Sequence, residues 1–200
     1  MLLALYPVPI ITISIIGFIV VFTYRLRKTS SDQREIEQRF WERERKANAT
    51  RRRDISNLEY INIPPDLFPL NLGTETEKKL EAISQMQMLN LTGKSNTDLK
   101  LEYGLPNLEH LSECDDNFSE LVRILPDYVD ELLEAGQKED AQRILEFAVE
   151  IRADSRQIFD KLAQMYVEQG QDSRIDELIS IAQELESLSK HVILSDLNKM

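Results

Sequence analysis

The sequence predicts an all-α protein in which a single N-terminal transmembrane helix precedes a domain of helical hairpins. Residues 1–24 contain no charged side chain, whereas the remainder of the 200-residue chain is rich in charge. Apolar residues recur at helical spacing through the second half of the chain, and one pattern repeats after 34 residues. The formal charge of −11 combines a basic stretch at residues 25–53 with a strongly acidic remainder.

The uncharged N-terminal segment predicts a membrane anchor. As a helix, residues 2–24 would extend about 34 Å, enough to cross a hydrocarbon core of about 30 Å. No small-residue cleavage site follows the segment, which argues against a cleaved signal peptide. Basic residues follow it directly, so the positive-inside rule predicts a single-pass cell-membrane protein with its N-terminus outside and its C-terminal domain in the cytoplasm. The expected membrane-interface residues are Arg25, Arg27 and Lys28.

Residues 25–53 are predicted to form a basic juxtamembrane stalk. A helix capped by Ser31 is expected to end near Asn48. The stretch holds eleven Lys and Arg residues against five Asp and Glu residues. It is interpreted either as a solvated stalk or as a contact with the lipid bilayer. Nucleic acid is not an expected partner, because the acidic chain beyond would repel phosphate.

Residues 54–73 form a connector that is both proline-rich and apolar. Pro64, Pro65 and Pro69 fall within six residues, and this spacing forbids a regular helix or a central strand. A solvated linker would not carry so many Leu, Ile, Phe and Tyr side chains. The connector is therefore predicted to be extended and packed along the domain, with an exposed docking peptide as the alternative.

The helical domain is predicted to occupy residues 74–200. Thr74 and Glu77 form a capping box that opens a helix running to about Leu89. A second short helix is expected toward Tyr103, with its side-chain cap at residue 95 or 96.

The strongest internal signal is the 34-residue repeat, which aligns residues 132–151 with residues 166–185. Gly136 matches Gly170 within it, and apolar positions coincide along both copies. The repeats are placed at about residues 122–155 and 156–189, each a helix, a glycine turn and a second helix.

Two repeats rarely stand alone, because each buries its apolar face by stacking on neighbours. The helix at 75–89 and residues 105–114 are therefore expected to cap the N-terminal end of the stack. A terminal helix near residues 186–197 is expected to cover the other end.

The period and pattern of the repeat resemble those of tetratricopeptide-repeat proteins. This resemblance implies an α-solenoid whose ligands lie along the inner face formed by the first helix of each unit. Residues 91–125 are also similar to uncharacterised clostridial-type membrane-anchored tetratricopeptide-repeat proteins, a likeness that implies no activity.

The inner face that the resemblance implies is acidic, and it lacks the Lys and Arg pairs with which some family members hold a peptide's C-terminal carboxylate. A basic or amphipathic segment of a protein is therefore the expected partner. A solvated acidic face without a partner is the alternative. The candidate partner-binding residues are Asp130, Glu134, Asp160, Gln164 and Glu168.

Catalytic chemistry finds little support in the sequence. His110 and Cys114 share a helix face, but two ligands do not make a zinc site, and neighbours on one helix are poorly placed for nucleophilic catalysis. The Gly-Lys-Ser tripeptide at 93–95 lacks the upstream glycine of a phosphate-binding loop. No catalytic residue, metal or cofactor is expected. The sequence predicts a non-enzymatic, membrane-tethered cytoplasmic adaptor or scaffold, or alternatively a structural accessory subunit of a larger membrane protein complex.

Overall fold

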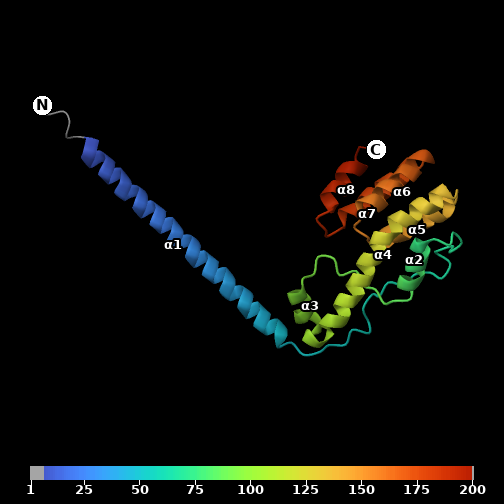
Figure 1. Cartoon of the computed structure of the whole chain (residues 1–200), viewed down its shortest axis with the longest axis horizontal. Helices are drawn as coiled ribbons and strands as arrows, with labels where there is room; N and C mark the ends of the chain where they lie inside the picture. The colour runs from blue at the N-terminus through green and yellow to red at the C-terminus, as the bar shows by residue number, and fades with distance from the viewer. Residues whose placement is uncertain (1–6, 200) are drawn as a thin grey trace.

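The computed structural model describes the backbone of residues 7–199 and the side chains of residues 13–25 and 33–199. Helices account for all regular secondary structure in this part of the chain. Over these residues there are eight α-helices, one short 3-10 helix and no strand. Helix α1 (Pro7–Asn48) projects away from the group formed by the other helices (Figure 1). The all-helical part of the predicted fold is thus observed.

Helix α1 corrects the prediction of a membrane anchor. No helix within the described residues combines the length and the apolar composition that crossing a membrane requires. The side chains of residues 7–12, which belong to the predicted anchor, lie outside the described residues. Residues 1–6 of the predicted anchor lie outside the described residues. The predicted transmembrane helix is therefore wrong.

The predicted localisation is wrong for the same reason. Single-pass insertion in the cell membrane, with an outside N-terminus and a cytoplasmic domain, depended on a membrane-spanning helix. Of the three expected membrane-interface residues, Arg25 is exposed on α1. The side chains of Arg27 and Lys28 lie outside the described residues.

The stalk does not begin as a separate helix at Ser31. Helix α1 runs through this position without interruption, because residues 18–48 contain no glycine or proline. The C-terminal end of α1 packs on α3 (Asn96–Tyr103) through a largely buried ion pair. Lys100 Nζ lies 2.6 Å from a Glu44 carboxylate oxygen and also donates to the Asn48 side chain at 3.0 Å. This pair fixes the direction in which α1 leaves the domain.

The connector packs along the domain, as its apolar composition predicts. Leu67 and Phe68 are buried, and the Phe68 ring meets the Tyr128 ring edge-on with 6.1 Å between centroids. The Ile61 N–H donates to the Met88 carbonyl at 3.0 Å, so the connector lies beside the segment that follows α2.

Helix α2 (Glu75–Ser84) is shorter than the predicted helix, which ran to about Leu89. Thr74 caps it and accepts a hydrogen bond from the Glu77 N–H. The helix stops early because the backbone beyond it bonds elsewhere: the Leu89 N–H donates to the Cys114 carbonyl at 3.2 Å.

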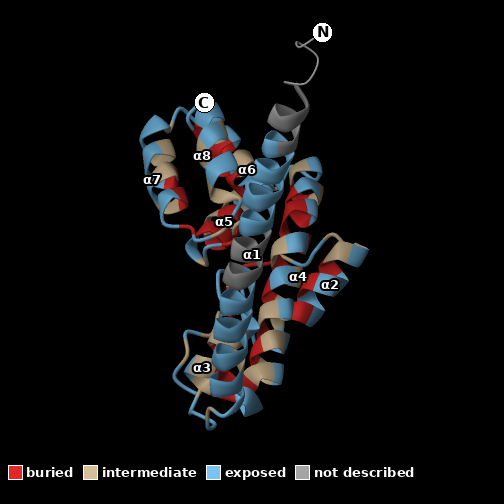
Figure 2. Cartoon of the chain, turned by 90° about the vertical axis from the view of Figure 1, so that its left-hand side faces the viewer, coloured by how far each residue is buried: buried red, intermediate tan, exposed pale blue. Residues whose placement is uncertain are grey.

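Helix α4 (Leu108–Glu134) extends well before the predicted start of the first repeat near residue 122. It follows the 3-10 helix at Leu105–Asn107 and runs through the buried Pro126. At 27 residues it spans about 40 Å, and α2 and α5 both pack against it. Figure 2 shows its buried residues facing these neighbours, whereas the described residues of α1 are exposed except near its C-terminal end, where Ala47 is buried against the domain.

The two predicted hairpins are present, and they repeat at an offset of 34 residues. The C-terminal half of α4 pairs with α5 (Lys138–Glu150), and α6 (Arg156–Glu168) pairs with α7 (Asp172–Gln183). Gly136 and Gly170 turn the two hairpins with φ of 79° and 67°, a left-handed conformation that favours glycine. In each turn the residue after the glycine donates to the carbonyl five residues earlier, at 2.8 Å and 2.9 Å.

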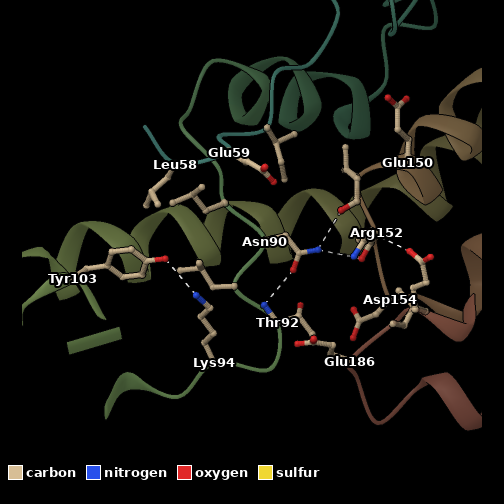
Figure 3. Close-up of a pocket in the computed structure, with 16 residues that line it drawn as sticks. Leu58, Glu59, Asn90, Thr92, Lys94, Tyr103, Glu150, Arg152, Asp154 and Glu186 are labelled. Carbon is tan, nitrogen blue, oxygen red and sulfur yellow. Dashed lines mark hydrogen bonds and ion pairs between the residues drawn. The ribbon is translucent and has the colours of Figure 1, made fainter. Parts of the chain in front are cut away.

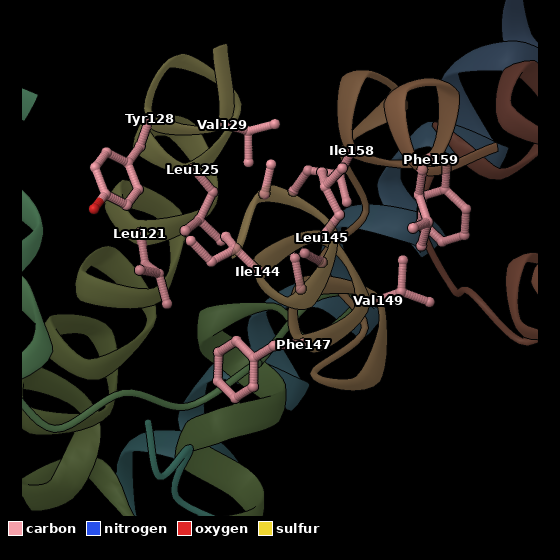
Figure 4. Packing of buried hydrophobic residues seen from close by; sticks show 14 of the residues in the cluster. Leu121, Leu125, Tyr128, Val129, Ile144, Leu145, Phe147, Val149, Ile158 and Phe159 are labelled. Carbon is pink, nitrogen blue, oxygen red and sulfur yellow. The ribbon is translucent and has the colours of Figure 1, made fainter. Parts of the chain in front are cut away.

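The core lies between the hairpins. The side chains that interdigitate there include Leu125 of α4, Ile144 and Leu145 of α5, and Ile158 and Phe159 of α6 (Figure 4). Helix α8 (Lys190–Leu197) covers α6 and α7, as expected for a terminal helix.

Gly104 ends α3 where the backbone of residues 51–52 crosses it. Its φ is +90°, and a Cβ there would lie 2.4 Å from the Arg51 carbonyl oxygen. We expect Gly104→Ala to lower the free energy of unfolding by roughly 3 kcal/mol, because backbone strain and a backbone clash add. Gly73→Ala is the matched control, since Gly73 has a φ of +70° with nothing near its Cβ position; it should cost about 1 kcal/mol. Urea unfolding measures both, and equal losses would show that residues 51–52 move aside.

Candidate functional site

The predicted inner face corresponds to the exposed sides of α4 and α6, which contact each other. Helix α8 lies next to α6 and extends the same layer. The two helices direct a mixture of charged, amide and apolar side chains to this side. The exposed ones are Arg123, Asp127, Asp130, Glu134, Gln157, Gln164, Val167 and Glu168.

Three of the five predicted binding residues lie open on this face. Glu134 and Glu168 occupy equivalent positions at the ends of α4 and α6, and both are exposed. Glu134 has no ion-pair partner among the described residues, and a Glu168 oxygen lies 3.7 Å from Lys138 Nζ with both side chains 70% exposed. Such a solvated pair is weak, so both carboxylates can be approached from solvent. Gln164 is exposed one turn before Glu168.

Asp130 lies on the same face, but its charge is shared. It forms an ion pair with Lys161, which links α4 to α6. A basic partner would therefore compete with Lys161 for this carboxylate.

Asp160 is not on the open face. Its carboxylate lies at the contact between α6 and α8, where Arg156 Nε is 3.3 Å from Asp160 and 2.7 Å from Asp196. The Asp160 Oδ1 atom is buried without a hydrogen-bond partner. Burial raises the pKa of Asp160 above its ordinary value, and Arg156 opposes the shift only in part. The structure thus brings four predicted residues together and assigns the fifth to a helix contact.

A pocket of about 630 Å³ lies at the opposite edge of the hairpins, where α5 and α7 end (Figure 3). The connector and residues 89–94 form one wall, and the segments that follow α5 and α7 form the other. Part of its lining is apolar. The apolar residues are Leu58, Ile61, Leu89, Leu91, Ile151 and Leu185.

The pocket is held in shape by long-range hydrogen bonds. The Asn90 amide donates to the carbonyls of Ile151 and Arg152, at 3.1 Å each. The Leu91 N–H donates to Asp115 at 3.1 Å. Sequence analysis missed this pocket, because Asn90 is 61 and 62 residues from its acceptors and no local pattern marks it.

Carboxylates outnumber cations around the pocket, and both cations are already paired. Lys94 Nζ lies 2.7 Å from Glu102, whose hydrogen bond raises the pKa of Lys94 and holds it charged. Arg152 lies 3.0 Å from Glu184. Four carboxylates of the lining have no ion-pair partner in the described part of the chain. These are Glu59, Glu150, Asp154 and Glu186.

The one cysteine is poorly suited to nucleophilic chemistry. Its Sγ lies 3.7 Å from His110 Nε2, but Cys114 is only 1% exposed. Burial raises the pKa of the Cys114 thiol, so it stays protonated at neutral pH. Within the described residues, no group of three or more His, Cys, Asp and Glu side chains is placed to hold a metal.

No family model, curated protein or solved structure matches this chain. The resemblance to tetratricopeptide-repeat proteins therefore stays a prediction. The equivalent glycine turns and the 34-residue offset between hairpins support it.

Proposed function

We propose that this chain is a non-enzymatic protein-binding module, an adaptor that takes a basic or amphipathic segment of a partner protein along the α4–α6 face. The observation that carries the proposal is the exposed pair of equivalent carboxylates, Glu134 and Glu168, at the ends of these two helices. Gln164 adds an amide that can both donate and accept hydrogen bonds next to them.

Apolar contact is available beside the charges. Val167 is 47% exposed on α6, and Leu133 is partly buried beside Glu134 on α4. A segment that presents basic and apolar side chains alternately on one side would match both features. The two helices pack on a common core, so the face is ordered before a partner arrives, and this limits the entropic cost of binding.

Charge reversal on the face tests the proposal. Full-length protein carrying Glu134→Lys and Glu168→Lys is crosslinked in cells, captured and compared with the wild type by quantitative mass spectrometry. Recovery of one dominant partner should fall by about tenfold, because two attractive charges become repulsive. The matched control reverses Glu139 and Glu177, exposed residues at the start of α5 and in α7, and should change recovery by less than about twofold.

Circular dichroism should give the same helicity for all three proteins. If the Glu134/Glu168 variant and the Glu139/Glu177 control lose the partner equally, the loss is caused by the change in net charge, and the assignment of binding to this face is contradicted. If the wild-type protein enriches no partner, the adaptor function itself is contradicted.

A further inference from the structure

We propose that the pocket between the connector and the ends of α5 and α7 binds a single arginine or lysine side chain of the partner's segment, together with a neighbouring apolar side chain. The inference rests on the proposed function for the kind of partner, a basic or amphipathic protein segment. It adds a second contact, in a partly open pocket at the edge of the hairpins opposite the Gly136 and Gly170 turns.

The cavity has the dimensions of a ligand site. Its volume of about 630 Å³ lies within the range of roughly 300–1,000 Å³ that is typical of pockets that enclose small ligands. Its walls come from five separate stretches of the chain, and the Asn90 and Asp115 hydrogen bonds hold residues 90–91 against the end of α5 and against α4. The cavity is therefore preformed, and a side chain can enter it without rearranging the fold.

The charge of the lining selects a cation. Five carboxylates line the pocket against two cations, Lys94 and Arg152, and Lys94 is paired with Glu102, which is not part of the lining, so the lining keeps an excess of negative charge. Asp154 and Glu186 reach into the pocket from the hairpin side below Thr92 (Figure 3). A positive group that enters the pocket is attracted by both carboxylates.

Two helix ends add to the negative potential. Ile151 and Glu184 are the C-terminal caps of α5 and α7, and both residues line the pocket. The carbonyl ends of helices carry a partial negative charge, so both ends favour a cation and disfavour an anion.

The apolar part of the lining selects a long aliphatic stem. Leu58, Ile61 and Ile151 line the pocket and are partly exposed, so they offer apolar surface that a guest can cover. Arg and Lys side chains bury their methylene stems against apolar surface while their charged ends reach polar groups. A compact inorganic cation would leave this apolar surface uncovered.

Glu186 lies directly over Gly93. A Cβ at Gly93 would come within 3.2 Å of a Glu186 carboxylate oxygen, so the glycine leaves that carboxylate room to turn toward a guest.

A matched pair of peptide probes tests the pocket on the full-length protein. The first probe is acetyl-Leu-Arg-Leu-amide, and the second replaces arginine with citrulline, which keeps the shape and removes the charge. Each is titrated while the backbone amide signals are followed by NMR. The arginine probe should shift the signals of Asn90, Thr92 and Arg152 and bind at least about tenfold more tightly than the citrulline probe.

Two double variants that remove the same net charge from different places locate the site. Asp154→Asn with Glu186→Gln should weaken binding of the arginine probe by about tenfold, and Glu59→Gln alone by a few-fold, because each removes attraction inside the pocket. Glu134→Gln with Glu168→Gln makes the same change in net charge on the α4–α6 face and should leave probe binding within about twofold of the wild type. Unchanged thermal unfolding of the variants confirms that the pocket is intact.

The outcomes separate the two proposals. Equal affinity of the arginine and citrulline probes, or signal shifts confined to the α4–α6 face, would overturn the pocket inference and leave the adaptor function standing. If the arginine probe binds in the pocket but the protein captures no partner in cells, the adaptor function is overturned and the pocket remains a site for a cationic side chain.

Discussion

Replacing Glu77 with alanine is expected to lower the free energy of unfolding by roughly 4 kcal/mol. Glu77 is 5% exposed, and its carboxylate accepts hydrogen bonds from the N–H groups of Leu72 and Gly73, at 2.9 Å and 2.6 Å, and from the Tyr128 hydroxyl at 3.1 Å. Alanine would leave the buried Tyr128 hydroxyl, the N–H of the partly buried Leu72 and the N–H of the exposed Gly73 without this acceptor. Urea unfolding measures the loss, and a value below about 1 kcal/mol would show that water replaces the carboxylate.

The same residue gives a pH dependence with a definite sign. Burial raises the pKa of Glu77, but the hydrogen bonds from Leu72, Gly73 and Tyr128 outweigh it and hold the pKa below the ordinary value of 4.5. A carboxyl group with a lowered folded-state pKa stabilises the fold above its unfolded pKa and loses that contribution as the pH falls through the folded value. The stability gap between wild type and Glu77→Gln should therefore be full at neutral pH and close well below pH 4.5. A gap that stays constant over this range would contradict the assignment.

The second large effect is expected in the core, where Phe159→Ala should cost about 4 kcal/mol. Phe159 is fully buried in α6, within the cluster that joins the two hairpins, so truncation leaves a cavity that the packed helices cannot fill. Gln157→Ala, on the exposed side of the same helix, should change stability by less than about 0.5 kcal/mol. Urea unfolding followed by circular dichroism compares them. A small loss for Phe159→Ala would indicate that the hairpins do not share one core.

The parts of the fold that depend on local signals were predictable from sequence. Gly136 and Gly170 mark their turns because a left-handed φ favours glycine. The short helix α3 begins after Ser95, whose hydroxyl accepts a hydrogen bond from the Asp98 N–H in a complete capping box. The terminal helix α8 followed from the need to cover the last hairpin.

Helix α1 continues through Ser31, and α4 begins well before the first repeat at about residue 122, because no helix breaker stands at either position. A favourable cap such as Ser31 does not end a helix when the residues around it continue the helical pattern. Pro126 lies inside α4, where tertiary packing on α2 and α5 supports the helix around it.

The candidate sites were only partly predictable. Repeat equivalence placed Glu134 and Glu168 on one face, but it could not show that α8 covers Asp160. The pocket depends on contacts among segments far apart in the chain, such as Asn90 with Arg152, and no periodic pattern encodes such contacts. The length of the uncharged N-terminal run, the lack of a cleavage site and the basic flank together predicted a membrane anchor, and over the described residues no helix meets the requirements for one.

Photo-crosslinking from single positions in cells would test the adaptor function most directly. A photoreactive amino acid is placed at Gln164, on the exposed side of α6, and separately at Ser180, exposed on α7 away from the proposed binding face. Binding along the α4–α6 face predicts one dominant protein crosslinked from Gln164, and little or none of it from Ser180. The same set of proteins from both positions, or no crosslink from Gln164, would contradict partner binding at this face.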